Sequence, residues 1–87
     1  MKVQNMKNSK GNIVKNQFII EGDDGSLTFQ SYNTVIAMKK EGKIYLDPLN
    51  WDYSVSTGKY RNIFLHETKK ETERKIKEKI YILKVLN

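Results

Sequence analysis

Apolar positions in the first third of the chain predict two strands joined by a tight turn. Apolar residues gather between 13 and 20, and the Gly- and Asp-rich segment 21–26 suits the left-handed positions of a hairpin turn. In the strand that starts at Leu27, side chains alternate between a set suited to the core and a set suited to solvent or a partner. The two sets are Leu27, Phe29 and Ser31, and Thr28, Gln30 and Tyr32.

Two further strands are predicted before the middle of the chain. Residues 34–38 form an apolar run short enough for a buried strand, and Asn33 is expected to mark a bulge or bend before it. The turn at 39–42 leads into a strand at 43–47. Pro48 ends that strand, because proline lacks the N–H group that a sheet ladder needs. The first half of the chain therefore predicts a mostly antiparallel sheet.

The apolar spacing then changes from strand-like to helical. Tyr60, Ile63 and Phe64, with Glu67 as a further candidate, fall on one helical face at i, i+3, i+4, i+7 spacing. Ser56 or Thr57 can cap the first turn by accepting a hydrogen bond from a free backbone N–H group. The pattern predicts one short helix over about residues 57–65.

A second helix and a last strand complete the predicted order. Thr68 and Glu71 have the spacing of a capping box, so a helix is expected to begin near Lys69. The apolar, β-branched segment 81–86 indicates a strand inside the sheet. The order β-β-β-(β)-α-α-β predicts an α+β domain, a small antiparallel sheet with two short helices on one face. Its expected buried residues are Phe29, Ile36, Phe64 and Leu83.

The first residues show neither the helical nor the strand period. Residues 1–11 contain three Lys, no acidic residue and only scattered apolar ones. We predict a flexible basic N-terminal arm over 1–11, followed by a single α+β domain over 12–87. The alternative is a frayed terminus without a role, because disorder concentrates at chain ends.

Length and composition argue against catalysis. A chain of 87 residues supports one small core and no roomy, water-excluding cleft. It has no Cys and a single His, His66, which is expected to cap the end of the first helix rather than to catalyse. We expect no catalytic, cofactor-binding or metal-binding residues. No apolar run approaches the roughly 20 residues of a membrane span, so we expect a cytoplasmic protein without a membrane partner.

Positive charge is concentrated at the two ends of the chain. The formal net charge is +6, and the segment 67–87 carries seven basic and four acidic residues. If the N-terminal arm and the second helix lie on one side, these seven basic residues, which include Lys69, Lys70, Arg74 and Lys77, form a face that attracts phosphates together with four from the other end. Those four are Lys2, Lys7, Lys10 and Lys15. Because 14 of the 16 basic residues are Lys, such a face would bind with little sequence preference. The alternative is a solvated helix face that provides solubility.

Aromatic residues offer a second kind of candidate surface. Tyr32, Trp51 and Tyr53 add more aromatic area than a core of this size can hide. Tyr and Trp are frequent at interfaces, because each combines a large rigid ring with one polar group. For Trp51 the alternative is a lid on the core, since it follows a strand that a proline ends.

Two segments of the chain resemble small uncharacterised proteins encoded by phages and mobile elements of AT-rich bacteria. Residues 28–37 are similar to the pattern FxSYxTxIA, and residues 51–65 are similar to WDYSxTTxKYxxxFL. The likeness covers about residues 27–80. The chain departs from the commoner Arg-Thr-Thr form at residues 55–57, so it lacks a basic residue at the helix entry.

The resemblance implies a phage context, in which proteins of this size bind and redirect a host machine. We therefore predict a non-enzymatic binding protein that targets a host defence or nucleic-acid complex, most specifically an anti-CRISPR inhibitor. Its partner would be a host protein or ribonucleoprotein complex. The alternatives are an autonomous basic nucleic-acid-binding protein, which contacts phosphates through its Lys-rich ends, and a structural or assembly factor. The expected partner-binding residues are Tyr32, Trp51, Tyr53, Lys59, Arg61, Lys69, Lys70, Arg74 and Lys77.

Overall fold

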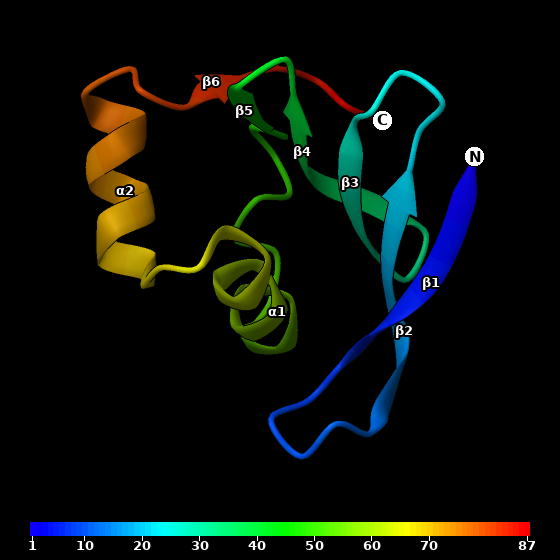
Figure 1. The fold of residues 1–87 in the computed structure, drawn as a ribbon. Helices are drawn as coiled ribbons and strands as arrows, with labels where there is room; N and C mark the ends of the chain where they lie inside the picture. The colour runs from blue at the N-terminus through cyan, green and yellow to red at the C-terminus, as the bar shows by residue number, and fades with distance from the viewer.

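A computed structural model describes residues 1–87 as a six-stranded sheet with two helices, which confirms the α+β class (Figure 1). The strands are β1 (Lys2–Lys7), β2 (Ile13–Glu21), β3 (Leu27–Ser31), β4 (Thr34–Lys40), β5 (Lys43–Leu46) and β6 (Ile82–Leu83), and the helices are α1 (Val55–Leu65) and α2 (Lys69–Lys77). Strand order in the sheet follows the sequence, and only the β5–β6 pair is parallel. Both helices lie on one side of the twisted sheet (Figure 1). Neither has the length and apolar character needed to cross a membrane.

The core lies between α1 and one face of the sheet. A row of paired residues crosses five strands on this face, from Ile19 through Phe29, Ala37 and Leu46 to Leu83. We call this set the core row. The ring of Phe64 on α1 packs 5.9 Å from the ring of Phe29, measured between centroids. The predicted burial of Phe29, Ile36 and Phe64 is confirmed.

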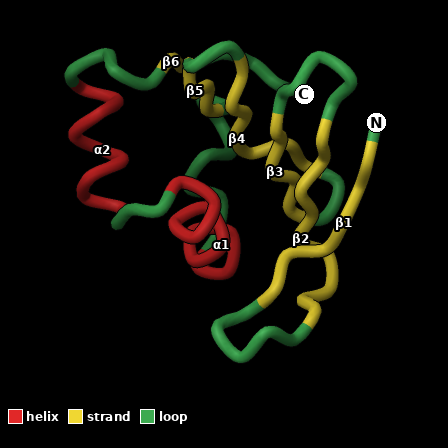
Figure 2. Tube along the Cα trace, in the orientation of Figure 1, coloured by secondary structure: helices red, strands yellow, loops and turns green.

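The predicted burial of Leu83 is wrong. Leu83 is 46% exposed, although it stands at the end of the core row. The reason is its position, because β6 is only two residues long and forms the edge of the sheet. Figure 2 shows that the segment after α2 is almost entirely loop, with β6 as its short strand. The expected strand over 81–86 is therefore much reduced.

The first residues differ from the expected flexible arm, since they form the edge strand β1. Lys2 to Asn5 pair with β2 in antiparallel register, and Met6 is buried in the core. An edge strand needs only backbone pairing on one side, so its outward side chains can be polar and show no period. This is why the segment lacks the apolar alternation that predicts a strand.

The irregularity expected at Asn33 has another form. Ser31 pairs with Thr34, so Tyr32 and Asn33 form a two-residue turn between β3 and β4, with Tyr32 at φ 55°. The register instead shifts within the β3–β4 ladder, where Ile36 has no partner on β3. An extra residue in one strand is a bulge. It allows the consecutive residues Ile36 and Ala37 both to be buried.

Local hydrogen bonds define the ends of the helices. The side chain of Ser54 accepts from the Thr57 backbone N–H at 3.1 Å, so α1 begins at Val55, before the cap expected at Ser56 or Thr57. His66 ends α1 in the left-handed conformation, and its backbone N–H bonds to carbonyls of the last turn. The capping box of α2 is confirmed, with Thr68 and Glu71 bonding reciprocally.

Candidate functional site

A groove runs along the outer side of α1 toward the start of α2. Its volume is about 610 Å³. The groove brings together three of the expected binding residues, Lys59 and Arg61 from α1 and Lys69 from α2. Its lining residues are Val55, Gly58, Lys59, Arg61, Asn62, Ile63 and Lys69.

Arg61 supports the groove from below and is fully buried, which corrects its expected role as a partner contact. Its Nη1 donates to the carbonyl of Trp51 at 2.8 Å and to Asp52 Oδ1 at 3.2 Å, and its Nη2 donates to Asn62 Oδ1 at 2.9 Å. The guanidinium also lies 5.1 Å from the Trp51 ring. Arg61 therefore fastens the loop before α1 to the helix.

Trp51 also helps to hold the loop before α1 in place. It is partly buried and packs against the core, as expected for the lid rather than for an exposed contact.

Asp52 links the α1 side of the groove to the α2 side, since it also accepts from Lys69 Nζ at 2.8 Å. Burial would raise the pKa of Asp52, but hydrogen bonds from Lys69 and Arg61 hold it below its usual value. Lys69 is thus paired within the protein, while Lys59 forms no ion pair.

Exposed apolar side chains surround the start of α1. Leu49, Tyr53 and Val55 are 85%, 66% and 92% exposed, and they lie within seven residues of one another. Val55, Lys59 and Ile63 are spaced four residues apart, so they form one exposed stripe along the helix. Ile63, which the apolar spacing groups with the buried Phe64, is 40% exposed and lies on the outer side of α1 instead. We use the name α1 stripe for four residues, Tyr53, Val55, Lys59 and Ile63. Clustered apolar groups of this kind mark interaction sites in soluble proteins.

Three of the basic residues of α2 share one exposed side of the helix. Lys70, Arg74 and Lys77 follow helical spacing on the side opposite the buried Thr72 and are exposed. Arg74 is partly neutralised, because it donates to both carboxylate oxygens of Glu78 at 3.1 Å. We call these three residues the α2 stripe. Lys69 is not part of the α2 stripe. Tyr32, another of the expected partner-binding residues, is also outside it and is exposed on the β3–β4 turn.

A buried carboxylate, which the helical spacing grouped with the face of Phe64, connects α2 to the rest of the protein. The Glu67 side chain is only 3% exposed. It accepts from Thr72 Oγ1 at 2.6 Å, from Lys75 Nζ at 2.7 Å and from the Tyr81 hydroxyl at 2.6 Å. Burial would raise the pKa of Glu67, but these three hydrogen bonds lower it. Burial and the bond to Glu67 raise the pKa of Tyr81 to about 12.

We expect Glu67 to make stability depend on acidic pH. Its pKa in the folded protein lies below the usual 4.5, so its contribution is complete above pH 4.5 and is lost as the pH falls through the folded value. Urea unfolding between pH 7 and pH 3 tests this. The Glu67→Gln variant should be less stable at pH 7 and lose less stability in acid. Equal acid losses in the two proteins would contradict the prediction.

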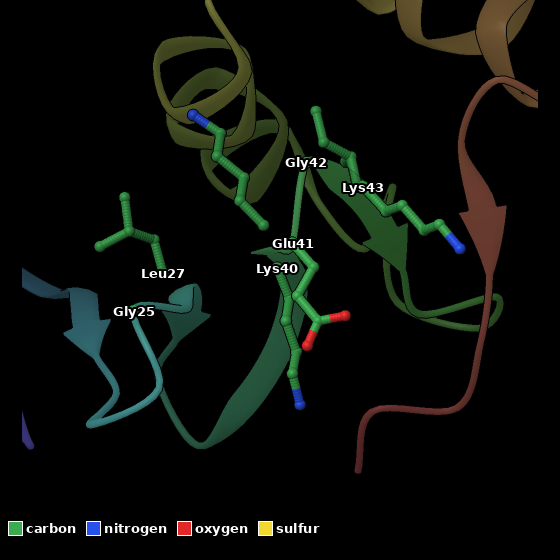
Figure 3. A pocket seen from close by; sticks show the side chains of 8 residues that line it. Gly25, Leu27, Lys40, Glu41, Gly42 and Lys43 are labelled. Carbon is green, nitrogen blue, oxygen red and sulfur yellow. The ribbon is translucent and has the colours of Figure 1, made fainter.

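A second hollow, of about 280 Å³, lies at the β4–β5 turn and contains three lysines. They do not converge on one point. Figure 3 shows Lys40 and Lys43 extending in different directions. Lys39 Nζ donates to the Phe64 carbonyl at 2.6 Å, and Lys40 pairs with Asp24 at 3.3 Å. The hollow is therefore no anion site. No three acidic or histidine side chains converge where they could hold a metal ion.

Comparisons with known proteins place the chain in a family without assigning a function. No curated protein matches it, and neither does any solved structure. One protein family matches residues 1–81, a range that includes every element from β1 to α2, the whole α1 groove and Glu67. The chain therefore belongs to DUF8033, a family of unknown function.

Proposed function

We propose that this protein is a non-enzymatic binding protein that engages a partner through the α1 stripe. The observation that carries the proposal is the exposure of Tyr53, Val55 and Ile63 beside the α1 groove. Leaving such groups in water is unfavourable by about 25 cal/mol per Å² of apolar area. A partner that covers them recovers this free energy on binding.

The chemistry of the groove indicates what the partner provides. Apolar walls from Val55 and Ile63 favour an aliphatic or aromatic side chain, and the unpaired Lys59 favours a carboxylate at the rim. The resemblance to small phage proteins supports the proposal that the partner is a host defence complex. In its most specific form, the protein inhibits a CRISPR effector.

The test is phage plating on bacteria that carry an active, phage-targeting CRISPR system. Expression of the wild-type protein should restore plaque formation on these cells. The double variant Val55→Asp/Ile63→Asp should abolish this rescue, because carboxylates would replace both apolar walls. Val85→Asp is the matched control, since Val85 is exposed and lies outside the groove.

Thermal melting of all three proteins shows whether the variants fold. No rescue by the wild-type protein in any of the major CRISPR classes would overturn inhibition as the function. Rescue by the folded double variant equal to that of wild type would show that the α1 stripe is not the binding surface.

A second candidate function, binding to nucleic acid, is favoured by the α2 stripe. Lys70, Arg74 and Lys77 share one exposed side of α2, which would track phosphates without reading bases. The Glu78 pairing of Arg74 weakens this surface. The α1 stripe is therefore the better supported site.

A further inference from the structure

The face of the sheet opposite α1 is not covered by a helix (Figure 1). Because side chains alternate along a strand, the neighbours of the core row point to this face. The strand register aligns one residue from each of the six strands into a continuous line, in which every member pairs with the next. We call this line the open row, and its members are Val3, Ile20, Thr28, Met38, Tyr45 and Ile82.

The open row is apolar apart from Thr28, and none of its members is fully buried. A parallel line two residues away adds Asn5, Phe18, Gln30 and Val35, none of which is fully buried. The solvent face of an antiparallel sheet is ordinarily polar. This face therefore has the composition of a surface that meets a partner, with two aromatic rings, Phe18 and Tyr45.

Positive charge lies around this face, and neither line contains an acidic residue. Lys43 follows the alternation of Tyr45 to the same side, and in Figure 3 its side chain extends in the direction of β6. Lys84 Nζ lies 5.5 Å from the centre of the Tyr45 ring. Neither Lys43 nor Lys84 forms an ion pair, so the face complements an anionic partner that carries flat rings.

We infer that the open face binds single-stranded nucleic acid. Bases stack on Phe18 and Tyr45, and phosphates contact Lys43 and Lys84, which is how sequence-tolerant single-strand sites operate. Phe18 and Tyr45 lie three strands apart and two residues apart along the strands, roughly 16 Å at the usual strand spacing and rise. The site is independent of the α1 stripe and of the α2 stripe.

A second copy of the chain is a poorer occupant of this face. Two copies packed through it would bring Lys43 and Lys84 of one chain near those of the other, and each chain carries a net charge of +6. A duplex is also a poorer occupant, because its bases are stacked internally and cannot lie on Phe18 or Tyr45. The inference therefore predicts a preference for single strands.

The experiment measures fluorescence anisotropy of labelled oligothymidylate of fifteen nucleotides, and of a duplex of equal length, across a salt series. Wild-type protein should bind the single strand more tightly. Phe18→Leu/Tyr45→Leu keeps the face apolar but removes stacking, and should weaken binding by about ten-fold or more. Lys43→Gln/Lys84→Gln should reduce the slope of log K against log salt by about 0.7 for each lost contact.

The matched control removes more charge from another surface. Lys70→Gln/Arg74→Gln/Lys77→Gln should change the single-strand affinity less than Lys43→Gln/Lys84→Gln, although it neutralises three residues instead of two. Circular dichroism checks that every variant folds, and Lys43→Gln/Lys84→Gln changes only exposed groups. A larger effect of the α2 variant would assign nucleic-acid binding to the α2 stripe and overturn the inference.

Two other results would also overturn it. Absence of single-strand binding at low salt would exclude this partner. Sedimentation equilibrium that shows a dimer, which Met38→Glu converts to a folded monomer, would assign the open face to a second copy of the chain.

Discussion

Replacing Phe29 by alanine should lower the free energy of unfolding by about 3–5 kcal/mol. Phe29 is fully buried in β3, where its neighbours in the core row are Ile19 and Ala37. Its ring also provides the surface on which Phe64 holds α1 to the sheet. Removing it leaves a cavity between the two layers. Small domains have only about 5–15 kcal/mol of stability, so the variant should be largely unfolded at moderate urea concentrations.

Urea unfolding followed by circular dichroism measures this loss. Val85→Ala is the control, because an exposed apolar side chain should change stability by less than about 0.5 kcal/mol. Phe29→Leu should fall between the two, since it retains part of the buried volume. A loss below about 1 kcal/mol for Phe29→Ala would mean that α1 does not depend on this contact.

Replacing Arg61 by alanine should cost about 2–4 kcal/mol, because the change removes a buried hydrogen-bonded charge. The carbonyl of Trp51 and the amide of Asn62 would both lose their donor. Asp52 would keep Lys69 as its partner, which limits the penalty. Arg61→Lys should recover only part of this lost stability, because one ammonium group cannot reach all three acceptors.

Unfolding and partner binding together separate the two roles considered for Arg61. A structural role predicts that Arg61→Lys loses stability but, where it is folded, retains the activity that depends on the α1 stripe. An Arg61→Lys protein as stable as wild type but without activity would show that the guanidinium contacts the partner. The buried geometry would then have to open on binding.

The candidate surface was only partly predictable from the sequence. Lys59, Lys69 and Tyr53 were expected at an interface, and the structure places the two lysines on one groove with Tyr53 just before its helix. Residue type was sufficient to expect their exposure, but the meeting of Lys59 and Lys69 at one groove depends on how α2 is placed beside α1. Arg61 belongs to the same pattern in the sequence. Its burial depends on Trp51 and Asp52, which fold back over it.

The row of residues on the open face was also only partly predictable from the sequence. The alternation of Thr28 and Gln30 with Phe29 indicated that β3 has an outer side suited to solvent or a partner. The strand register then determined that Thr28 lies between Ile20 and Met38. A shift of one residue in any ladder would have exchanged the two faces. The continuous open row is therefore a property of the pairing.

Features that depend on neighbours within a few residues could be predicted before the fold was known. These include the capping box of Thr68 and Glu71, the turn at 21–26 and the alternation along β3. Such features arise from short-range hydrogen bonds and from the two- and 3.6-residue periods of side chains.

Features that depend on partners far along the chain arise only when the whole chain folds. Glu67 is buried because Tyr81, fourteen residues later, donates to it. Asp47 is buried because it accepts from the Leu86 backbone at 3.0 Å across 39 residues. A buried carboxylate is stable only when donors replace its lost water, and those donors are brought together by the fold. The helical spacing grouped Glu67 with Phe64, but no local pattern identifies the distant donors that make the burial of Glu67 and Asp47 stable.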